Sequence, residues 1–212
     1  MNITQALLPT GQYISTGSTV KSQIVLHHTC SNPVSITGDK TWWESTPERV
    51  ATHFIVSATG EIFQLVPLDA WAYSLGLNNI HRDTIEKRLI SIEIDSWGAL
   101  TYDFKQKSYK SWTGEVIPKN EICVLSAPYR NVRYFQKYTA AQILAVENLI
   151  NWLSQELNIH GDFNVENMFQ VNQKALTGAN VLTSHASFRQ DKTDIYPQPE
   201  MVKMLKRLKL QK

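Results

Sequence analysis

A short apolar run at residues 23–28 constrains the fold more than any other feature of this chain. Its sequence, Gln-Ile-Val-Leu-His-His, is rich in β-branched residues and predicts a buried strand that carries two histidines at its end. A second apolar run, at residues 89–94, contains one carboxylate, Glu93, flanked by Ile92 and Ile94. Both runs predict strands of a buried sheet, and each carries a chemically active side chain.

Further strands are expected around a tight turn and near the end of the chain. Residues 53–57 and 61–66 are strand-like, and the turn between them ends in Gly60, which favours a hairpin. A short apolar run at residues 181–183 predicts a strand that leads directly to His185. These runs add three strands to the expected sheet.

A short helix is expected over residues 39–50. Either Asp39 or Thr41 is suited to cap its first turn. Trp42 and Trp43 give this helix large side chains to bury. We therefore expect both tryptophans to pack against the domain.

A long helix is expected to begin after Thr139, with Gln142 as the capping-box partner three residues later. Its apolar residues recur at helical spacing and predict one buried face, formed by Ile143, Val146, Leu149, Ile150, Leu153 and Leu157. A closing helix is expected over residues 199–208. Because helices and strands alternate, the sequence favours an α/β fold with a central mixed β-sheet flanked by helices.

Residues 96–138 interrupt this alternation with aromatic side chains set among polar residues and several lysines. We interpret this segment as an insertion packed on the rim of the domain. Its aromatic residues favour local packing, although Trp97 and Trp112 are also candidates to stack on a sugar ring. The chain contains no internal repeat, low-complexity tract or linker, so residues 1–212 are expected to form a single domain.

The net charge of the chain excludes few classes of function. A net charge of +2 over 212 residues gives no argument for nucleic-acid binding. Residues 199–212 form a basic helix and tail, which is either a solvated surface or a weak attraction to anionic polymers or lipid. No apolar run approaches the roughly 18 residues that a membrane span needs. Residues 1–13 lack the pattern of a signal peptide, so synthesis in the cytoplasm is expected.

A metal site is the main chemical hypothesis from the residues alone. A single histidine at the end of a strand is usually structural, but His27 and His185 both occupy such positions, and Asp194 follows the second. Two imidazoles and one carboxylate suit zinc and leave a fourth position for water. Glu93 is then the candidate base, and Lys192 is the candidate group to stabilise an oxyanion.

The two cysteines are the other candidates for metal ligation or for a disulfide bond. Cys30 and Cys123 are too few for a disulfide framework, and nothing in the sequence indicates that they pair. Cys30 follows a His-His-Thr run, yet the histidines are better placed as ligands. The His-Glu-x-x-His zinc motif is absent, so spacing alone leaves the metal hypothesis open.

Four blocks of the sequence, in order, carry a resemblance to a known family. They are residues 24–29, 52–67, 91–94 and 184–194. In these blocks the chain resembles the type 2 N-acetylmuramoyl-L-alanine amidases, which share a fold with phage lysozyme-type amidases and peptidoglycan recognition proteins. The resemblance covers roughly residues 22–94 and 139–197.

The resemblance implies one zinc ion per chain, held by His27, His185 and Asp194, with Glu93 and Lys192 as catalytic residues. Asp191 is the alternative third ligand. Lysozyme-type members carry a catalytic tyrosine where this chain has Thr52, which shifts the expected proton transfer to Glu93. His28 is expected to support the site, His53 to orient the hairpin, and His81 and His160 have no assigned role.

Substrate contacts are less well defined by the resemblance. Many members carry a Trp-His-Ala-Gly stretch, and here Trp71-Ala72-Tyr73-Ser74-Leu75-Gly76 retains the tryptophan and glycine without the histidine. Trp71, Tyr73 and Thr29 are the candidates for contacts with a peptidoglycan or muropeptide substrate.

The resemblance implies zinc-dependent hydrolysis of the amide between N-acetylmuramic acid and L-alanine. A phage-type endolysin, released through a separate pore to reach the cell wall, is the favoured role. The alternatives are a cytoplasmic enzyme of muropeptide recycling and a noncatalytic peptidoglycan-binding module. A metallohydrolase of the same architecture that acts on another amide is a more remote possibility.

Overall fold

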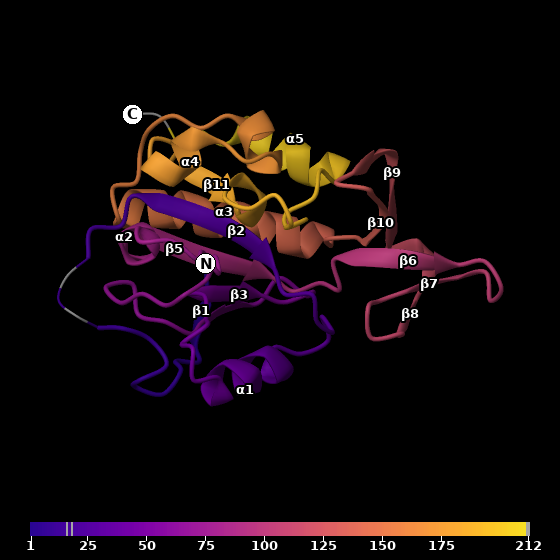
Figure 1. Cartoon of the computed structure of the whole chain (residues 1–212), viewed down its shortest axis with the longest axis horizontal. Coiled ribbons are helices and arrows are strands. Elements are labelled where there is room, and N and C mark those ends of the chain that lie inside the picture. The colour runs from indigo at the N-terminus through magenta and orange to yellow at the C-terminus, as the bar shows by residue number, and fades with distance from the viewer. Residues whose placement is uncertain (16, 18, 211–212) are drawn as a thin grey trace.

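The central sheet follows from strands that are apolar on both faces. The computed structural model describes residues 1–15, 17 and 19–210. Within them, the sheet has the order β1-β4-β3-β5-β2-β11 (Figure 1). Its strands are β1 (Ile3–Gln5), β2 (Gln23–His28), β3 (Phe54–Val56), β4 (Ile62–Gln64), β5 (Leu89–Ile94) and β11 (Leu182–Ser184). Neighbouring strands run parallel except for the antiparallel β3–β4 hairpin, so the sheet is mixed, as predicted.

The helices cover both faces of this sheet, which makes the fold α/β. They are α1 (Thr37–Ser45), α2 (Arg82–Lys87), α3 (Ala140–Glu156), α4 (Gln173–Thr177) and α5 (Pro199–Arg207), with 3-10 turns at Lys119–Glu121, Val165–Phe169 and His185–Ser187. On one face, α3 and α5 pack on a core that includes Ile24 of β2 and Ile92 of β5. On the other face, Trp43 of α1 contacts a cluster with Ile55, and Ile85 of α2 lies in a cluster with Val25. Burial on both sides explains the continuous apolar runs of these strands.

The long helix and the hairpin fix one another. The predicted capping box is present: Gln142 N donates to Thr139 Oγ1 at 3.0 Å, and Thr139 N donates to Gln142 Oε1 at 2.9 Å. The Thr139 hydroxyl in turn donates to the Ala58 carbonyl in the hairpin turn at 2.8 Å. Gly60 has φ +83°, and a Cβ there would lie 2.8 Å from the Ala141 carbonyl oxygen. Glycine at position 60 therefore permits both the turn and its close approach to α3.

The first helix is shorter than predicted. It spans Thr37–Ser45 rather than 39–50, and no side chain caps its start. Thr46 precedes Pro47, and a residue before proline is disfavoured in the helical region. The backbone of Thr46 is therefore extended, which ends the helix. Trp43 is buried, but Trp42 is 55% exposed, so the expectation that both would pack is wrong for Trp42.

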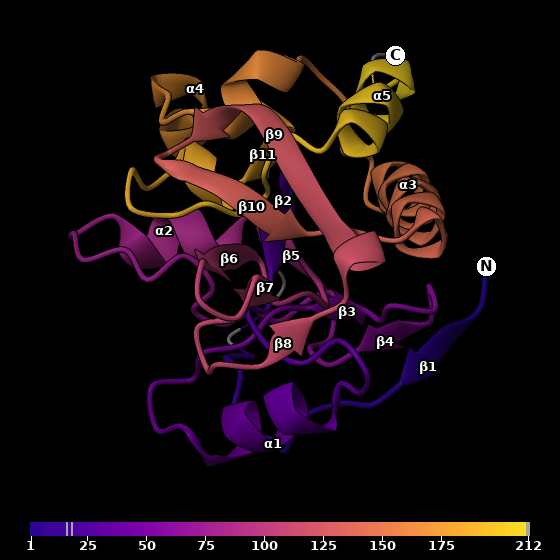
Figure 2. The ribbon, with the colours of Figure 1, turned by 90° about the vertical axis from the view of Figure 1, so that its right-hand side faces the viewer.

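The segment predicted as an insertion forms a second sheet of its own. Its order is β8-β7-β6-β10-β9, and all neighbouring strands are antiparallel. The strands are β6 (Ala99–Asp103), β7 (Ser108–Lys110), β8 (Val116–Ile117), β9 (Ile122–Tyr129) and β10 (Val132–Gln136). Figure 2 shows this insertion sheet in front of the central one, with β8 reaching toward α1. Leu125 and Phe135 join the main core, whereas Leu100 and Ile117 form a small core within the insertion.

The C-terminal helix carries part of the predicted basic surface. Arg207 of α5 pairs with Glu147 of α3, with 2.6 Å between Arg207 Nε and Glu147 Oε1. Lys212 belongs to the predicted tail and lies outside the described residues. None of the helices found in residues 1–15, 17 and 19–210 is both long and apolar enough to cross a membrane.

Candidate metal centre and active site

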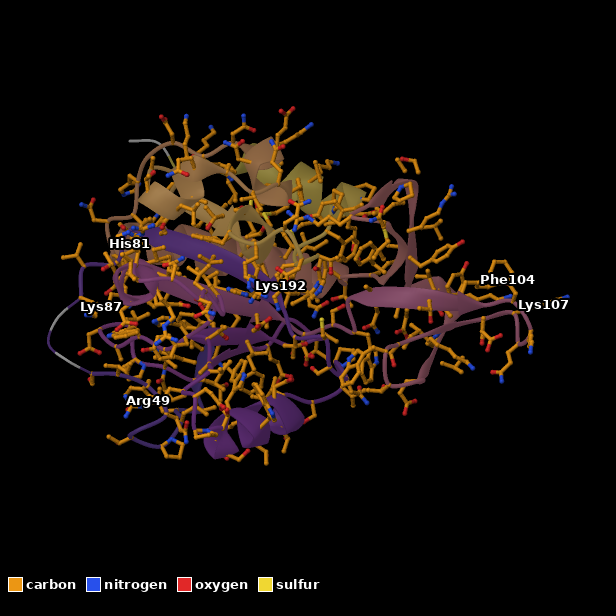
Figure 3. The ribbon with its side chains drawn as sticks, viewed as in Figure 1. Arg49, His81, Lys87, Phe104, Lys107 and Lys192 are labelled. Carbon is orange, nitrogen blue, oxygen red and sulfur yellow. The ribbon has the colours of Figure 1, made fainter. Side chains whose placement is uncertain are left out.

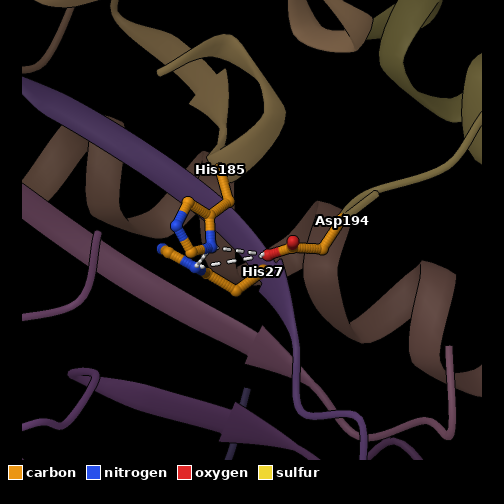
Figure 4. Close-up of side chains that lie close together, drawn as sticks. All are labelled: His27, His185 and Asp194. Carbon is orange, nitrogen blue, oxygen red and sulfur yellow. Dashed lines mark hydrogen bonds and ion pairs between the residues drawn. The ribbon is translucent and has the colours of Figure 1, made fainter. Parts of the chain in front are cut away.

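Three buried side chains from distant parts of the chain converge at the ends of the central strands. Figure 4 shows His27, His185 and Asp194 turned toward one another. His27 Nδ1 lies 3.1 Å from His185 Nδ1, and Asp194 Oδ2 lies 3.0 Å from His185 Nδ1 and 3.5 Å from His27 Nδ1. Within the described residues, these three side chains form the group whose ligand atoms lie close enough together to bind one metal ion.

The topology explains why these residues meet. In the parallel pair β2–β5, His27 lies directly opposite Glu93. In the parallel pair β2–β11, Leu26 lies opposite Ser184, so His185 follows beside His27. Asp194 returns to the same place because its carbonyl accepts a hydrogen bond from Ala186 N at 2.9 Å. The carboxyl ends of parallel strands lie at one edge of a sheet, and ligand sites form there in α/β folds.

The hydrogen bonds around His185 favour a cation between the three groups. His185 Nε2 lies 2.9 Å from the Leu75 carbonyl, and a carbonyl only accepts, so Nε2 carries the proton. In the neutral ring, Nδ1 then presents a lone pair toward Asp194 Oδ2, and two acceptors at this distance repel unless a cation lies between them. Bonds of about 2.0–2.1 Å in a tetrahedral zinc site place ligand atoms roughly 3.3 Å apart. The observed separations of 3.0–3.5 Å fit such an ion.

The protonation states also suit a metal. Burial lowers the pKa of His27 to about 4, so its ring is neutral near pH 7. For Asp194, burial alone would raise the pKa, but in the metal-free site the positive charge of a protonated His185 and hydrogen bonds from His185 and His27 hold it well below its usual value, and a bound cation would take the place of those protons. Neutral imidazoles and an ionised carboxylate are the forms that bind zinc.

The three residues open into a cavity of about 420 Å³ that also holds both predicted catalytic groups. Its lining includes Thr29, Cys30, Asp39, Trp42, Trp43, Val50, Ser74, Glu93, Asp191, Lys192 and Thr193. Figure 3 shows Lys192 near the middle of the molecule, at the ends of the central strands. The structure thus brings the five predicted metal-binding and catalytic residues to one cavity.

Glu93 is a carboxyl group in an unusual setting. Its Oε2 atom is buried, and no partner for it lies within the described residues. Burial, followed by the negative charge of Asp194, raises the pKa of Glu93 well above its usual value. A carboxyl that has a raised pKa and lies beside a candidate metal site, with one oxygen unpartnered within the described residues, is suited to accept and return a proton.

The predicted substrate contacts are only partly in the cavity. Thr29 lines it, and its hydroxyl donates to Asp95 Oδ1 at 3.1 Å. Trp71 is 2% exposed and lies outside the lining, which contradicts the expected substrate contact because its ring is enclosed by the protein. Tyr73 also lies outside the lining, and its hydroxyl donates to Asp83 Oδ1 at 3.2 Å.

The neighbouring histidines have structural partners, as predicted. His28 is also among the residues that line the cavity, and its Nδ1 lies 2.9 Å from the Tyr138 hydroxyl. His53 accepts a hydrogen bond from Ser91 N at 3.2 Å and donates from Nε2 to the Ala70 carbonyl at 3.2 Å, so both ring nitrogens are used within the hairpin region.

The alternative ligands lie outside the cluster. Asp191 pairs with Arg189 at 2.6 Å on the surface, which leaves Asp194 as the carboxylate beside the histidines. Cys30 lines the cavity but contributes no ligand atom to the group, and its carbonyl accepts a hydrogen bond from Trp112 Nε1 at 2.7 Å. Thr52, at the position of the lysozyme-type tyrosine, is buried, and its hydroxyl donates to the Phe54 carbonyl.

One buried carboxylate near the site was not predicted from the sequence. Glu86 of α2 is 1% exposed and accepts hydrogen bonds from Ser74 N at 3.1 Å, Leu75 N at 2.9 Å and the Ser74 hydroxyl at 2.9 Å. Glu86 thereby holds the backbone of Leu75 in place, and the Leu75 carbonyl orients His185. A metal-bound histidine is commonly oriented by such an outer partner. The polar segment around Glu86 offers no sequence signal for this role.

Comparisons with known proteins agree with this geometry. The family model described as N-acetylmuramoyl-L-alanine amidase matches residues 17–199, and this chain belongs to that family. No curated protein matches the chain. Among solved structures, the catalytic domain of XlyA superposes with a TM-score of 0.52 at 17% identity, covering 98% of this chain and 94% of that one.

Two further structures share the fold. N-acetylmuramoyl-L-alanine amidase LysC from Clostridium intestinale URNW gives a TM-score of 0.51 at 16% identity, covering 99% of both chains. The amidase AmiD from E. coli, solved with anhydro-N-acetylmuramic acid-L-Ala-D-gamma-Glu-L-Lys, gives 0.52 at 17% identity, covering 89% of this chain and 59% of that one. At these identities the structural matches establish the fold. Membership of the family supports amide hydrolysis in peptidoglycan as the activity.

Proposed function

We propose that this protein is a zinc-dependent N-acetylmuramoyl-L-alanine amidase that cuts the amide between muramic acid and L-alanine. The observation that carries the proposal is the convergence of two histidine nitrogens and one carboxylate oxygen, 3.0–3.5 Å apart, beside a carboxyl group with no other partner. His27, His185 and Asp194 would hold the ion. When bound, zinc supplies a Lewis acid that polarises the amide carbonyl and lowers the pKa of water.

The remaining steps belong to the side chains in the cavity. Glu93 takes the proton from the attacking water and delivers it to the leaving nitrogen of L-alanine, since its raised pKa suits both transfers. Lys192 lines the same cavity and places a positive charge where the tetrahedral oxyanion develops. Thr29 lines the cavity, and we propose it as a substrate contact.

The favoured role is that of an endolysin, which acts on the intact cell wall after release through a separate pore. A relative of the same fold is a mutant endolysin from Bacillus subtilis, which supports this role by analogy. AmiD was solved with a soluble anhydromuropeptide, which keeps muropeptide recycling as the second candidate. A noncatalytic binding module is disfavoured because binding alone gives no reason to keep Glu93 and Lys192 beside the metal ligands.

The decisive experiment is digestion of purified peptidoglycan with product analysis. We expect new free amino termini of L-alanine and no new reducing sugar ends. New reducing ends without alanine termini would instead identify a glycosidase and overturn the proposal. Comparing intact walls with soluble anhydromuropeptides then separates the endolysin from the recycling enzyme.

The metal is tested independently of the reaction. We expect about one zinc per chain by elemental analysis, and its loss in His27→Ala and Asp194→Ala. Asp191→Ala is the matched control, because this carboxylate lies in the same loop but pairs with Arg189 at the surface. Wild-type protein that holds no stoichiometric zinc and keeps full activity in a strong chelator would contradict the proposal.

A further inference from the structure

One arginine of the insertion sheet contacts the loop between two of the candidate metal ligands. Arg130 lies in the turn between β9 and β10, and it donates from Nη1 to the Arg189 carbonyl at 2.6 Å and to the Lys192 carbonyl at 2.5 Å. Its Nη2 donates to the Ala186 carbonyl at 2.8 Å. A single guanidinium therefore binds three carbonyls of the loop that connects His185 to Asp194.

The first residues of this loop, Ala186 and Ser187, are fully buried, and Ser187 Oγ donates to the Asn167 carbonyl at 3.0 Å. The residues after the 3-10 turn at His185–Ser187 form no helix or strand until α5, so the loop depends on individual hydrogen bonds. Three of these bonds join the ends of the loop and tie it to a neighbouring segment: Ala186 N donates to the Asp194 carbonyl, and Arg189 Nη1 donates to the carbonyls of Leu75 and Gly76. Arg130 supplies the support on the side of the insertion.

Arg130 is itself held in place. Arg130 and Asn131 have φ values of 49° and 66°, the left-handed pair typical of a tight two-residue hairpin turn. The guanidinium lies 5.5 Å from the centre of the Tyr129 ring, and Tyr129 packs edge-on against Phe169. The turn therefore presents a preorganised donor fork to the loop, which lowers the entropy cost of ordering each hydrogen bond.

A second contact joins the insertion to the opposite wall of the cavity. The Trp112 indole, between β7 and β8, is 73% exposed, yet its Nε1 donates to the Cys30 carbonyl at 2.7 Å. Cys30 follows β2 and lines the cavity, as Lys192 does after β11. The insertion thus contacts the segments that follow both histidine-bearing strands.

We propose that the insertion is a positioning element for the metal centre, and that Arg130 holds the loop over residues 186–192 so that Lys192 and Asp194 face the cavity. This inference rests on the proposed function of those two residues. Arg130 makes no contact with the ligand atoms and is a positioning residue, because its hydrogen bonds all go to backbone carbonyls. Arg130 would thereby keep the Asp194 carboxylate and the Lys192 ammonium group aligned in the cavity.

The test compares Arg130→Ala, Arg130→Lys and the control Arg133→Ala. Arg133 is an exposed residue of β10, and within the described chain it has no side-chain hydrogen bond or ion pair. Amide hydrogen exchange of the metal-free protein is measured over residues 186–194. We expect faster exchange in that loop for Arg130→Ala, an intermediate effect for Arg130→Lys, and none for Arg133→Ala.

Catalysis provides the second readout. Outer partners of metal ligands typically contribute roughly 10–100-fold to affinity or activity. We expect Arg130→Ala to lower kcat by about 10-fold or more, with KM and the melting temperature nearly unchanged, and added ethylguanidinium to restore part of kcat. Arg130→Lys remains testable if the alanine variant does not fold.

The outcomes are distinct. Wild-type loop exchange and wild-type kcat in Arg130→Ala would overturn the proposal, as would exchange that rises equally across the whole molecule. If the wild-type protein has no amidase activity, the proposed function fails, but loop exchange and competition for zinc by a chelator still report on the positioning role.

Discussion

The central sheet and the insertion sheet differ in how their strands are buried. In the central sheet, Ile24 and Ile92 face α3 and α5 while Val25 faces α2, so the strands are apolar on both sides. In the insertion, Leu100 faces a small core, but Val124 and Phe104 are exposed. Figure 3 shows Phe104 at the far tip of the insertion. A doubly covered sheet holds its strand ends rigidly, which suits a metal centre, whereas a one-sided sheet leaves side chains free to contact neighbouring loops.

The two sheets also contribute different chemistry to the cavity. The central strands place the candidate metal ligand His27 and the candidate acid–base residue Glu93 opposite each other at their ends. The insertion contributes hydrogen-bond donors, Arg130 and Trp112, that reach backbone carbonyls of the cavity walls. We therefore expect substitutions in the first region to remove activity and substitutions in the second to modulate it.

The largest expected effect is that of Glu93→Gln. This change removes a general base while it preserves size, so turnover should fall roughly 10²–10⁴-fold while zinc content stays near one per chain. Glu115→Gln, an exposed carboxyl in the insertion, is the control and should keep full activity. Steady-state hydrolysis and metal analysis are the measurements. Full turnover in Glu93→Gln would remove the chemical distinction between the two sheets.

A pair of leucine truncations tests the difference in packing. Leu149→Ala, in the fully buried face of α3, should cost about 2–5 kcal/mol of unfolding free energy, because it leaves a cavity in the main core. Leu100→Ala, in the small core of the insertion, should cost less, because half-exposed neighbours such as Tyr134 can relax into the space. Urea unfolding measures both, and an equal or larger loss for Leu100→Ala would show that the two cores are equally rigid.

The pH dependence of stability should also separate the regions, because residues 96–138 contain no histidine. Burial, followed by the positive charge of Lys21, lowers the pKa of His53 to about 3. The unfolded chain binds this proton near pH 6.5, so the contribution of neutral His53 is complete above pH 6.5 and is lost as the pH falls toward 3.

The pKa of His53 is lower in the folded than in the unfolded chain, so lowering the pH from 7 to 5 reduces the unfolding free energy by about 2 kcal/mol. His53→Gln should lack this component of the slope, whatever its stability at pH 7. The measurement is urea unfolding of both metal-free proteins at the two pH values. Identical slopes for the wild type and the variant would show that His53 titrates normally in the folded protein.

The smallest expected effect is that of Trp112→Phe. The change removes the hydrogen bond to the Cys30 carbonyl but little buried surface, so the loss of stability should be about 1 kcal/mol or less. Faster amide exchange just after β2 should accompany it. Trp42→Phe, which alters a 55% exposed tryptophan on α1, is the control and should leave exchange there unchanged. Equal amide exchange in both variants would mean that the Trp112 indole does not stabilise the segment after β2.

The sequence predicted the central region well and the insertion poorly, for physical reasons. Strands buried on both faces, such as residues 23–28 and 89–94, produce continuous apolar runs that are easily recognised. The insertion strands, including the eight-residue β9, mix exposed and partly buried residues, and α2 contains a single aliphatic residue, Ile85, so neither region has a strong pattern. Tertiary contacts decide their structure.

The candidate site shows the same division. The histidines were predicted because each ends an apolar strand, and Asp194 was preferred through the family resemblance. Asp191 remained an alternative until the structure showed its pairing with Arg189. The contributions of Glu86 and Arg130 could not be predicted, because both act on backbone groups whose positions depend on the folded path of the chain.

The position of β11 at the edge of the central sheet has a consequence for biosynthesis. Residues 182–184 pair with β2, which lies at residues 23–28 and is therefore made long before them. Until the ribosome has released this late segment, the edge of β2 stays open, and an open edge invites pairing with other chains. A nascent chain would therefore need protection of that edge between the synthesis of β2 and that of β11, and a product truncated before residue 182 would expose it permanently.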